Sequence, residues 1–220
     1  MTVERSVTIA RILNMLALAA LLLVLAGSLF LQFGLGEQPC PLCLIQRSGM
    51  IGLAIGPMLN LVRGLRPAHY AISILAACVG GAGSVRQILL HIATPGDPGF
   101  GPAVLGFHLY TWADIVFVIA VVGCALLLMW STPFSAQDEG ILGRRSAMRA
   151  IGIGFMAWVV LDLAIILLAV IPECGIGMCP DDPPEGPTLG AAGGAVLVLA
   201  VGVVAFVIGA VMNRRMATRD

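Results

Sequence analysis

The chain contains no lysine, and only 11% of its 220 residues carry a charged side chain. A soluble globular domain has about 25% charged residues, so this composition excludes an ordinary soluble domain. The arginines form no basic run that could follow a phosphate backbone, which excludes nucleic acid as a partner. The scarcity of charge instead indicates a chain surrounded by lipid.

A phosphate-binding motif and a zinc-finger motif are also missing. No glycine-rich phosphate-binding motif follows a predicted strand, so nicotinamide and ATP chemistry have no support. A zinc finger needs four ligands, and no second Cys-x-x-Cys or Cys/His pair with finger-like spacing accompanies Cys40 and Cys43. These absences leave redox chemistry as the leading interpretation of the one Cys-x-x-Cys.

Apolar residues are abundant: they make up 59% of the chain, and the mean hydropathy is +1.01. A helix needs about 20 apolar residues to cross a bilayer. We therefore predict an all-α polytopic membrane protein, a helical bundle with an uncleaved first helix, because the first apolar run continues past a signal-peptide-like Ala26-Gly27-Ser28. The predicted spans are Leu13–Phe33, Leu42–Val62, His69–Ile92, Leu109–Ser131, Ala150–Ile171 and Leu189–Met212.

The arginines outside the spans gather in every second connection. Cytoplasmic segments carry an excess of basic residues, so both termini are expected in the cytoplasm and the connections 34–41, 93–108 and 172–188 outside. Disulfides persist outside the cytosol, which allows an outer cysteine pair to cycle through an oxidised form. The arginines in the segments expected on the cytoplasmic side are Arg5, Arg11, Arg63, Arg66, Arg144, Arg145, Arg149, Arg214, Arg215 and Arg219.

The segment 38–47, Gln-Pro-Cys-Pro-Leu-Cys-Leu-Ile-Gln-Arg, places two cysteines and an arginine at the outer membrane surface. Cys40 followed by proline predicts a helix start, and Cys43 then lies in the first turn, where free N–H groups and the helix dipole favour the reactive thiolate. Arg47 follows four residues later on the same face and adds a permanent cation. A static disulfide, a metal-ligand pair or two packing residues are the alternatives.

Polar side chains near the outer end of the third span are further candidates, since such residues within a membrane are costly. Gln87 and His91 are four apart and can share a face beside the polar head of an apolar cofactor; His91 could instead contact lipid headgroups. Asp114 and Asp162 could pair with Arg86 or mark a proton route.

A second outer pair, Cys174 and Cys179, lies between the last two spans and is separated by flexible glycines. It can reach disulfide distance, either as a loop staple or as a redox pair that moves between Cys40 and a soluble partner.

Other features have simpler interpretations. Tyr110 and Trp112 suit the aromatic belt at the membrane interface. Cys78 and Cys124 are lone cysteines that should behave as small, buried apolar residues. The small-xxx-small pattern of residues 190–194 predicts a contact between helices.

The segment 39–47, together with Leu-Gly-Phe-His-Leu-Tyr-Thr-Trp at 105–112, makes the first 131 residues resemble the DsbB family of quinone-linked, disulfide-generating membrane proteins. The resemblance implies a four-helix bundle in the bacterial inner membrane, with the cysteine loops in the periplasm. It implies that Cys43 faces a bound ubiquinone or menaquinone and forms a thiolate–quinone intermediate, with electrostatic help from Arg47.

It further implies disulfides Cys40–Cys43 and Cys174–Cys179, with Cys40 exchanging electrons with the second pair. That pair would in turn oxidise a periplasmic, DsbA-like thioredoxin-fold protein. In the family's best-known form the second pair lies between spans three and four, where this chain has no cysteine. Either the pair has been relocated or it is structural, and we favour relocation.

The predicted organisation has three parts: a DsbB-like core at 1–131, a cytoplasmic connection at 132–149 and a transmembrane hairpin at 150–220. Two other functions fit some features. A vitamin K epoxide reductase-like protein also has an outer Cys-x-x-Cys, although the position of this pair before Arg47 argues against it. A soft-metal-handling transporter would be expected to show internal repeats, and we find no convincing one.

Overall fold

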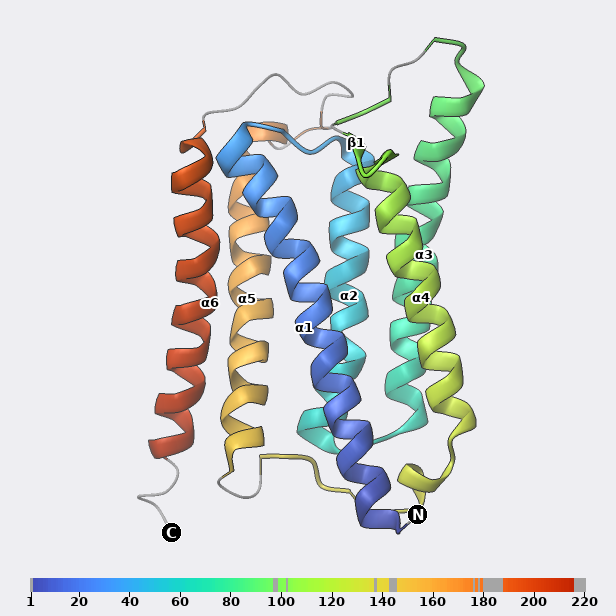
Figure 1. Cartoon of the computed structure of the whole chain (residues 1–220), viewed down its shortest axis with the longest axis vertical. Helices are drawn as coiled ribbons and strands as arrows, with labels where there is room; N and C mark the ends of the chain where they lie inside the picture. Colours follow the sequence, from blue (N-terminus) through green and yellow to red (C-terminus); the bar gives the residue numbers. More distant parts are fainter. Residues whose placement is uncertain are drawn as a thin grey trace.

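The computed structural model describes residues 2–96, 99–101, 103–136, 138–142, 146–175, 177, 179 and 188–215, without the side chains of 172 and 173. Within these residues, six long α-helices stand side by side (Figure 1). Each is long and apolar enough to cross a bilayer, which confirms the predicted all-α polytopic fold. The helices are α1 (Val3–Leu35), α2 (Pro41–Arg63), α3 (Pro67–Ala93), α4 (Leu109–Met129), α5 (Ala147–Cys174) and α6 (Gly190–Arg215).

Helix α1 is continuous over 33 residues and starts at Val3, ten residues before the predicted Leu13. It ends where Gly36 adopts a φ of 81°, a left-handed conformation that glycine reaches without strain. The chain then passes directly into α2, which keeps Cys40 close to the end of the bundle.

Glycines set the spacing of the central helices. Helix α2 packs on α1 and α3, and α3 packs on α4. A Cβ atom on Gly49 would lie 2.6 Å from the Cα of Gly80, and one on Gly80 would overlap the ring of Phe117. The helices approach this closely only because both positions lack side chains. Gly49 is one of the residues that lower the hydropathy of the second span, and it is a helix contact.

The last two helices pack on each other, and α6 also lies along α1. A Cβ atom on Gly194 would lie 2.5 Å from the Cα of Gly34, which confirms the predicted small-residue contact at that position. Around Gly190 a Cβ atom would meet nothing within 4 Å, so this glycine is not part of the contact. The N–H of Leu189 also donates to the carbonyl of Phe33 at 2.8 Å. The end of α1 is thus fixed to the start of α6.

The helices alternate in direction. The N-termini of α1, α3 and α5 therefore lie at the same end of the bundle as the C-termini of α2, α4 and α6 (bottom of Figure 1). The opposite end carries Cys40 and Cys174, and we call it the cysteine end. Six spans predict that the two cysteine pairs lie at the same end of the bundle, as observed. Which end faces the cytoplasm stays a prediction, as does the division into 1–131, 132–149 and 150–220.

A short hairpin joins α3 to α4 at the cysteine end. Its strands are β1 (Ala103–Val104) and β2 (Phe107–His108), which pair antiparallel. Leu105 and Gly106 between them have φ angles of 52° and 82°, as tight hairpin turns require. The indole N–H of Trp112 donates to a β1 carbonyl at 2.9 Å. The hairpin therefore lies against the first turn of α4.

A buried polar network joins α1, α2 and α3 at the other end. Asn14 donates to the Tyr70 hydroxyl at 2.8 Å, and Asn60 donates to the Asn14 side-chain oxygen at 3.0 Å. The Asn60 oxygen lies 2.9 Å from Nδ1 of His69. All four side chains are buried. Because each has a partner, the cluster avoids the cost of buried unpaired polar groups.

The ion pair found among the described side chains joins Arg11 and Asp138, so the predicted pairing of Arg86 with Asp114 or Asp162 is not seen there. Asp162 is fully buried within α5.

Candidate redox site

Helix α2 begins where the sequence predicts. Cys40 is its N-cap, with an extended backbone, and Pro41 is its first residue. The Cys40 sulfur accepts a hydrogen bond from the backbone N–H of Cys43 at 3.2 Å, as a serine or aspartate oxygen does in other helices. The two sulfurs form a disulfide, with Cα atoms 5.0 Å apart. The pair therefore lies within the electropositive first turn of α2.

This disulfide separates two cavities. Cys43 lines one of about 490 Å³, and Cys40 lines another of about 610 Å³. We call them the Cys43 cavity and the Cys40 cavity. Phe100 and Tyr110 line both cavities, so these two rings lie with the disulfide at the boundary between them. Each sulfur thus has its own approach.

The Cys43 cavity lies among α1, α2 and α4 and is mostly apolar. It extends to Leu23, which is 66% exposed on the outer face of α1. In a membrane, such an exposed apolar face contacts lipid, so the cavity opens toward the bilayer. Its apolar lining comprises Leu23, Val24, Gly27, Phe30, Leu31, Pro39, Met50, Phe100, Gly101, Leu109, Trp112, Ala113 and Val116.

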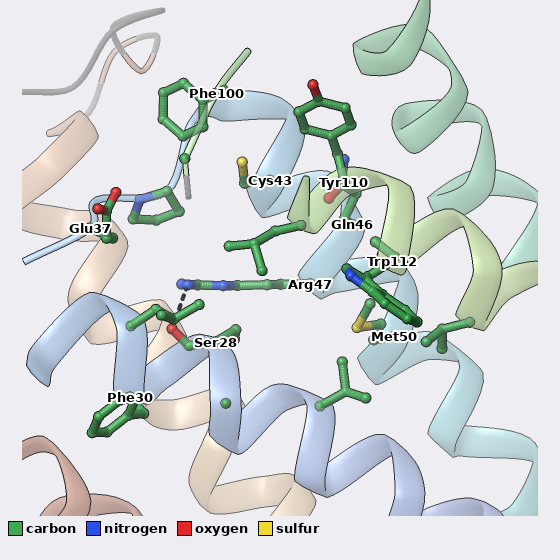
Figure 2. Close-up of a pocket in the computed structure, with 18 of the residues that line it drawn as sticks. Ser28, Phe30, Glu37, Cys43, Gln46, Arg47, Met50, Phe100, Tyr110 and Trp112 are labelled. Atoms are coloured by element: carbon green, nitrogen blue, oxygen red, sulfur yellow. Dashed lines mark hydrogen bonds between the residues drawn. The ribbon is translucent and has the colours of Figure 1, made fainter. Parts of the chain in front are cut away.

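Arg47 supplies the positive charge in this cavity. Its side chain is only 8% exposed, and α1 holds it: Nη1 donates to Oε1 of Gln32 at 2.6 Å and Nη2 to the Ser28 carbonyl at 3.1 Å. Figure 2 shows the guanidinium lying across the cavity toward Ser28, with Cys43 and Tyr110 on the other side. Both Cys43 and Arg47 line the cavity, as their four-residue spacing predicts. Two neutral acceptors thus fix a permanent cation near the sulfur.

The Cys40 cavity lies between α2, α3 and the segment 99–101, and its lining is more polar. Gln87 reaches the disulfide here: its Nε2 lies 3.3 Å from the Cys40 sulfur and 3.8 Å from the Cys43 sulfur. Nε2 of Gln46 donates to Oε1 of Gln87 at 2.8 Å. Gln87 was predicted to bind a cofactor, and the structure places it against the sulfurs.

His91 lines the same cavity as Gln87, which agrees with their predicted shared face. Its ring centroid lies 5.2 Å from that of His108, and His108 stacks on Tyr110. Tyr110 is only 3% exposed, so the prediction that it anchors the chain in the interfacial belt is wrong. His108, which belongs to β2, covers one face of the Tyr110 ring. Trp112 lines the Cys43 cavity.

Cys174 and Cys179 also form a disulfide, with Cα atoms 4.2 Å apart. Cys174 is the last residue of α5, and Gly175 follows it with a φ of 60°. Much of the connection from 176 to 187 lies outside the described residues. Whether this pair exchanges electrons or holds the loop stays a prediction.

Sequence reasoning missed two side chains and placed two others, Tyr110 and Cys78, wrongly. Gln46 and Gln32 were not identified, although isolated amides in apolar spans are a usable signal because they need partners in lipid. Cys78 and Cys124 are free thiols, but Cys78 is exposed on α3, where it was expected to be buried. Within the described part of the chain, no three His, Cys, Asp or Glu side chains come together as a metal site would require.

Comparison with known proteins points to one family. A family profile described as "DsbB: Disulfide bond formation protein DsbB" matches residues 10–99. The chain is 31% identical to disulfide bond formation protein B of Pseudomonas syringae pv. tomato, over 51% of this chain and 85% of the relative. It is 28% identical to the protein of that name from Burkholderia pseudomallei, over 54% of this chain and 89% of the relative. No solved structure matches.

Proposed function

Because this chain belongs to the DsbB family of disulfide bond formation membrane proteins, we propose that it is a thiol:quinone oxidoreductase that makes disulfides at the expense of membrane quinone. One observation supports this more than any other: the Cys40–Cys43 disulfide faces an apolar, lipid-facing cavity on one side and a more polar cavity on the other. Family membership leaves the vitamin K epoxide reductase-like alternative without support.

The residues of the Cys43 cavity fit a quinone. Phe100, Tyr110 and Trp112 offer flat apolar surfaces for a ring, and the opening at Leu23 suits an isoprenoid tail. The Arg47 guanidinium could donate to a carbonyl oxygen of the ring. Bound there, ubiquinone or menaquinone supplies an acceptor for an electron pair and protons.

Cys43 is the sulfur that gives up electrons on this side. Its place in the first turn of α2 favours its thiolate, which is the reactive form. Arg47 stabilises negative charge on the cavity side of that sulfur. Since Gln32 and Ser28 already hold the guanidinium, little reorganisation is needed when charge develops.

Cys40 is the sulfur that receives the electrons of the protein partner, a periplasmic thioredoxin-fold protein like DsbA, by way of the second cysteine pair. The partner first reduces Cys174 and Cys179, which act as a relocated shuttle pair. A thiolate of this incoming dithiol then attacks the Cys40 sulfur, a mixed disulfide forms, and the electron pair of the broken Cys40–Cys43 bond passes to the Cys43 sulfur. Cys174 and Cys179 lie at the same end of the bundle as Cys40.

The proposed setting is the bacterial inner membrane, with the cysteine end in the periplasm and both termini in the cytoplasm. The basic residues at the other end support this orientation: Arg63 and Arg66 lie where α2 meets α3, and Arg214 and Arg215 close α6. Cysteine-labelling with a reagent that cannot cross membranes tests it, since Cys40 of the reduced protein should react in intact spheroplasts.

The activity is tested by mixing the purified, reduced protein with short-chain ubiquinone or menaquinone analogues under anaerobic conditions. We expect one quinone to be reduced for each pair of protein thiols lost, and peptide mapping to find the new disulfide at Cys40–Cys43. Failure of both analogues to oxidise these thiols would overturn the proposal.

A further inference from the structure

We propose that Gln87 is a catalytic residue of the thiol exchange: its side-chain amide stabilises the thiolate of Cys40, and Gln46 is the positioning residue that orients this amide. The inference deepens the proposed function, because it names the group that serves the sulfur on the partner's side. It assigns the two sulfurs of one disulfide to two different stabilising groups, Gln87 for Cys40 and Arg47 for Cys43.

Two N–H donors converge on the Cys40 sulfur. The backbone N–H of Cys43 lies 3.2 Å from it and the Nε2 of Gln87 lies 3.3 Å from it. The same Nε2 is farther from the Cys43 sulfur, at 3.8 Å. Hydrogen bonds to a charged acceptor are about twice as strong as those between neutral groups, so this arrangement favours the thiolate over the thiol.

Gln46 determines which end of the Gln87 amide faces the sulfurs. An amide side chain has a donating nitrogen and an accepting oxygen, which must be assigned from their partners. Because the Gln87 oxygen accepts from Gln46 at 2.8 Å, its nitrogen is directed to the disulfide. Both glutamines are only 6% exposed, so the donor acts in a poorly hydrated site and is already oriented.

The step that benefits is the release of the incoming dithiol, the proposed shuttle pair, in its oxidised form. In the mixed disulfide with Cys40, the second thiolate of that dithiol attacks its own first sulfur. A new S–S bond forms within the dithiol, the S–S bond to Cys40 breaks, and the electron pair stays on Cys40 as a thiolate. Exchange is faster when the leaving thiolate is more stable. The Gln87 amide therefore accelerates departure from Cys40.

Other charged and titratable groups also face this site. Arg86 and His91 from α3 and Tyr110 from α4 line the Cys40 cavity, while Arg47 and Glu37 line the cavity beyond the disulfide. All of them are unchanged in the variants that replace a glutamine, so differences among those variants report the amide.

The test measures how fast iodoacetamide alkylates Cys40, as a function of pH, in a Cys43→Ser background and by mass spectrometry of the Cys40 peptide. Gln87→Met keeps the length of the side chain and removes the donor. We expect the midpoint of its pH profile to rise by about one pH unit, with about tenfold slower alkylation near neutral pH. Gln46→Met should give a smaller rise, because the amide remains but can rotate.

A control and a reciprocal arm make the outcome specific. Ser84→Ala removes another buried polar group from α3, a hydroxyl that donates to the helix carbonyl of Gly80, and should leave the midpoint unchanged. In a Cys40→Ser background, Arg47→Met should shift the alkylation midpoint of Cys43 upward more than Gln87→Met does.

An unchanged Cys40 midpoint in well-folded Gln87→Met would overturn the inference, and so would equal shifts at both sulfurs. If Gln87→Met does not fold, the Gln46→Met profile decides in the same way. Neither result depends on quinone reduction, so a failure here is distinguishable from a failure of the proposed function.

Discussion

The Cys43 cavity and the Cys40 cavity share the rings of Phe100 and Tyr110 but differ in what else lines them. The first is apolar, reaches the lipid-facing side of α1 and holds one buried cation. The second carries the exposed side chain of Arg86 together with Gln87 and His91. The contrast shows how one disulfide can serve two media: a lipid-soluble acceptor approaches one sulfur and a water-soluble donor approaches the other.

Replacing Cys43 removes the sulfur from the Cys43 cavity and should have the largest effect on quinone reduction. Cys43→Ser leaves the apolar cavity without its sulfur, so reduction of a quinone analogue by a small dithiol should fall to the uncatalysed rate. The measurement is quinone absorbance under anaerobic conditions. Cys124→Ser, which removes a free thiol from α4, serves as the control and should reduce quinone at the normal rate.

The second pair tests the supply of electrons to the Cys40 side. In the double variant Cys174→Ser/Cys179→Ser, a shuttle role predicts loss of at least about tenfold in oxidation of the DsbA-like protein, with quinone reduction by a small dithiol retained. Both assays are run on the same preparation. Near-normal rates in both would show that this disulfide only holds the loop at the end of α5.

Arg47 should matter less than the sulfur it assists. A hydrogen bond to a charged group contributes about 1.5–3 kcal/mol, so Arg47→Met should slow quinone reduction roughly 10- to 100-fold. Arg47→Lys keeps the charge but loses the fork that reaches Gln32 and Ser28, and should lie between. Stopped-flow oxidation of the reduced protein measures both. A wild-type rate in Arg47→Met would contradict the assigned role.

Substitution of Gly27 should have the smallest effect, and that effect should be limited to the Cys43 cavity. A Cβ atom there meets nothing within 4 Å and Gly27 lines the Cys43 cavity, so we expect the side chain of Gly27→Leu to take up part of that cavity. We expect KM for quinone to rise about tenfold, within the 1–3 kcal/mol typical of hydrophobic pockets, while exchange with the DsbA-like protein is unchanged. Gly123→Leu is the matched control, since Gly123 also has open space around it but lies outside both cavities.

Local signals predicted much of this architecture. Six apolar runs predicted six helices, because a span must satisfy its own backbone in lipid. Cys40 followed by Pro41 predicted the start of α2, because proline suits the first helical position. The spacing of Cys43 and Arg47 placed both on one cavity, since side chains four residues apart share a helix face.

Contacts between helices could not be predicted in the same way. Gln46 and Gln87 are 41 residues apart, and their hydrogen bond depends on how α2 and α3 rotate when Gly49 and Gly80 pack together. Tyr110 is buried where the rings of His108 and His91 lie against it, and its amphipathic character alone does not indicate this. The partition of the disulfide between two cavities likewise requires three-dimensional packing.

Photolabelling most directly tests the central claim that quinone and the electron-donating dithiol reach the disulfide from opposite sides. Native membranes containing the protein are irradiated with a photoreactive quinone analogue, and the labelled peptides are identified by mass spectrometry. We predict labels on residues 23–31 of α1 and 109–116 of α4, which line the Cys43 cavity, and competition by unmodified quinone. Competable labelling concentrated instead on residues 86–91 of α3, which border the Cys40 cavity, would contradict the account.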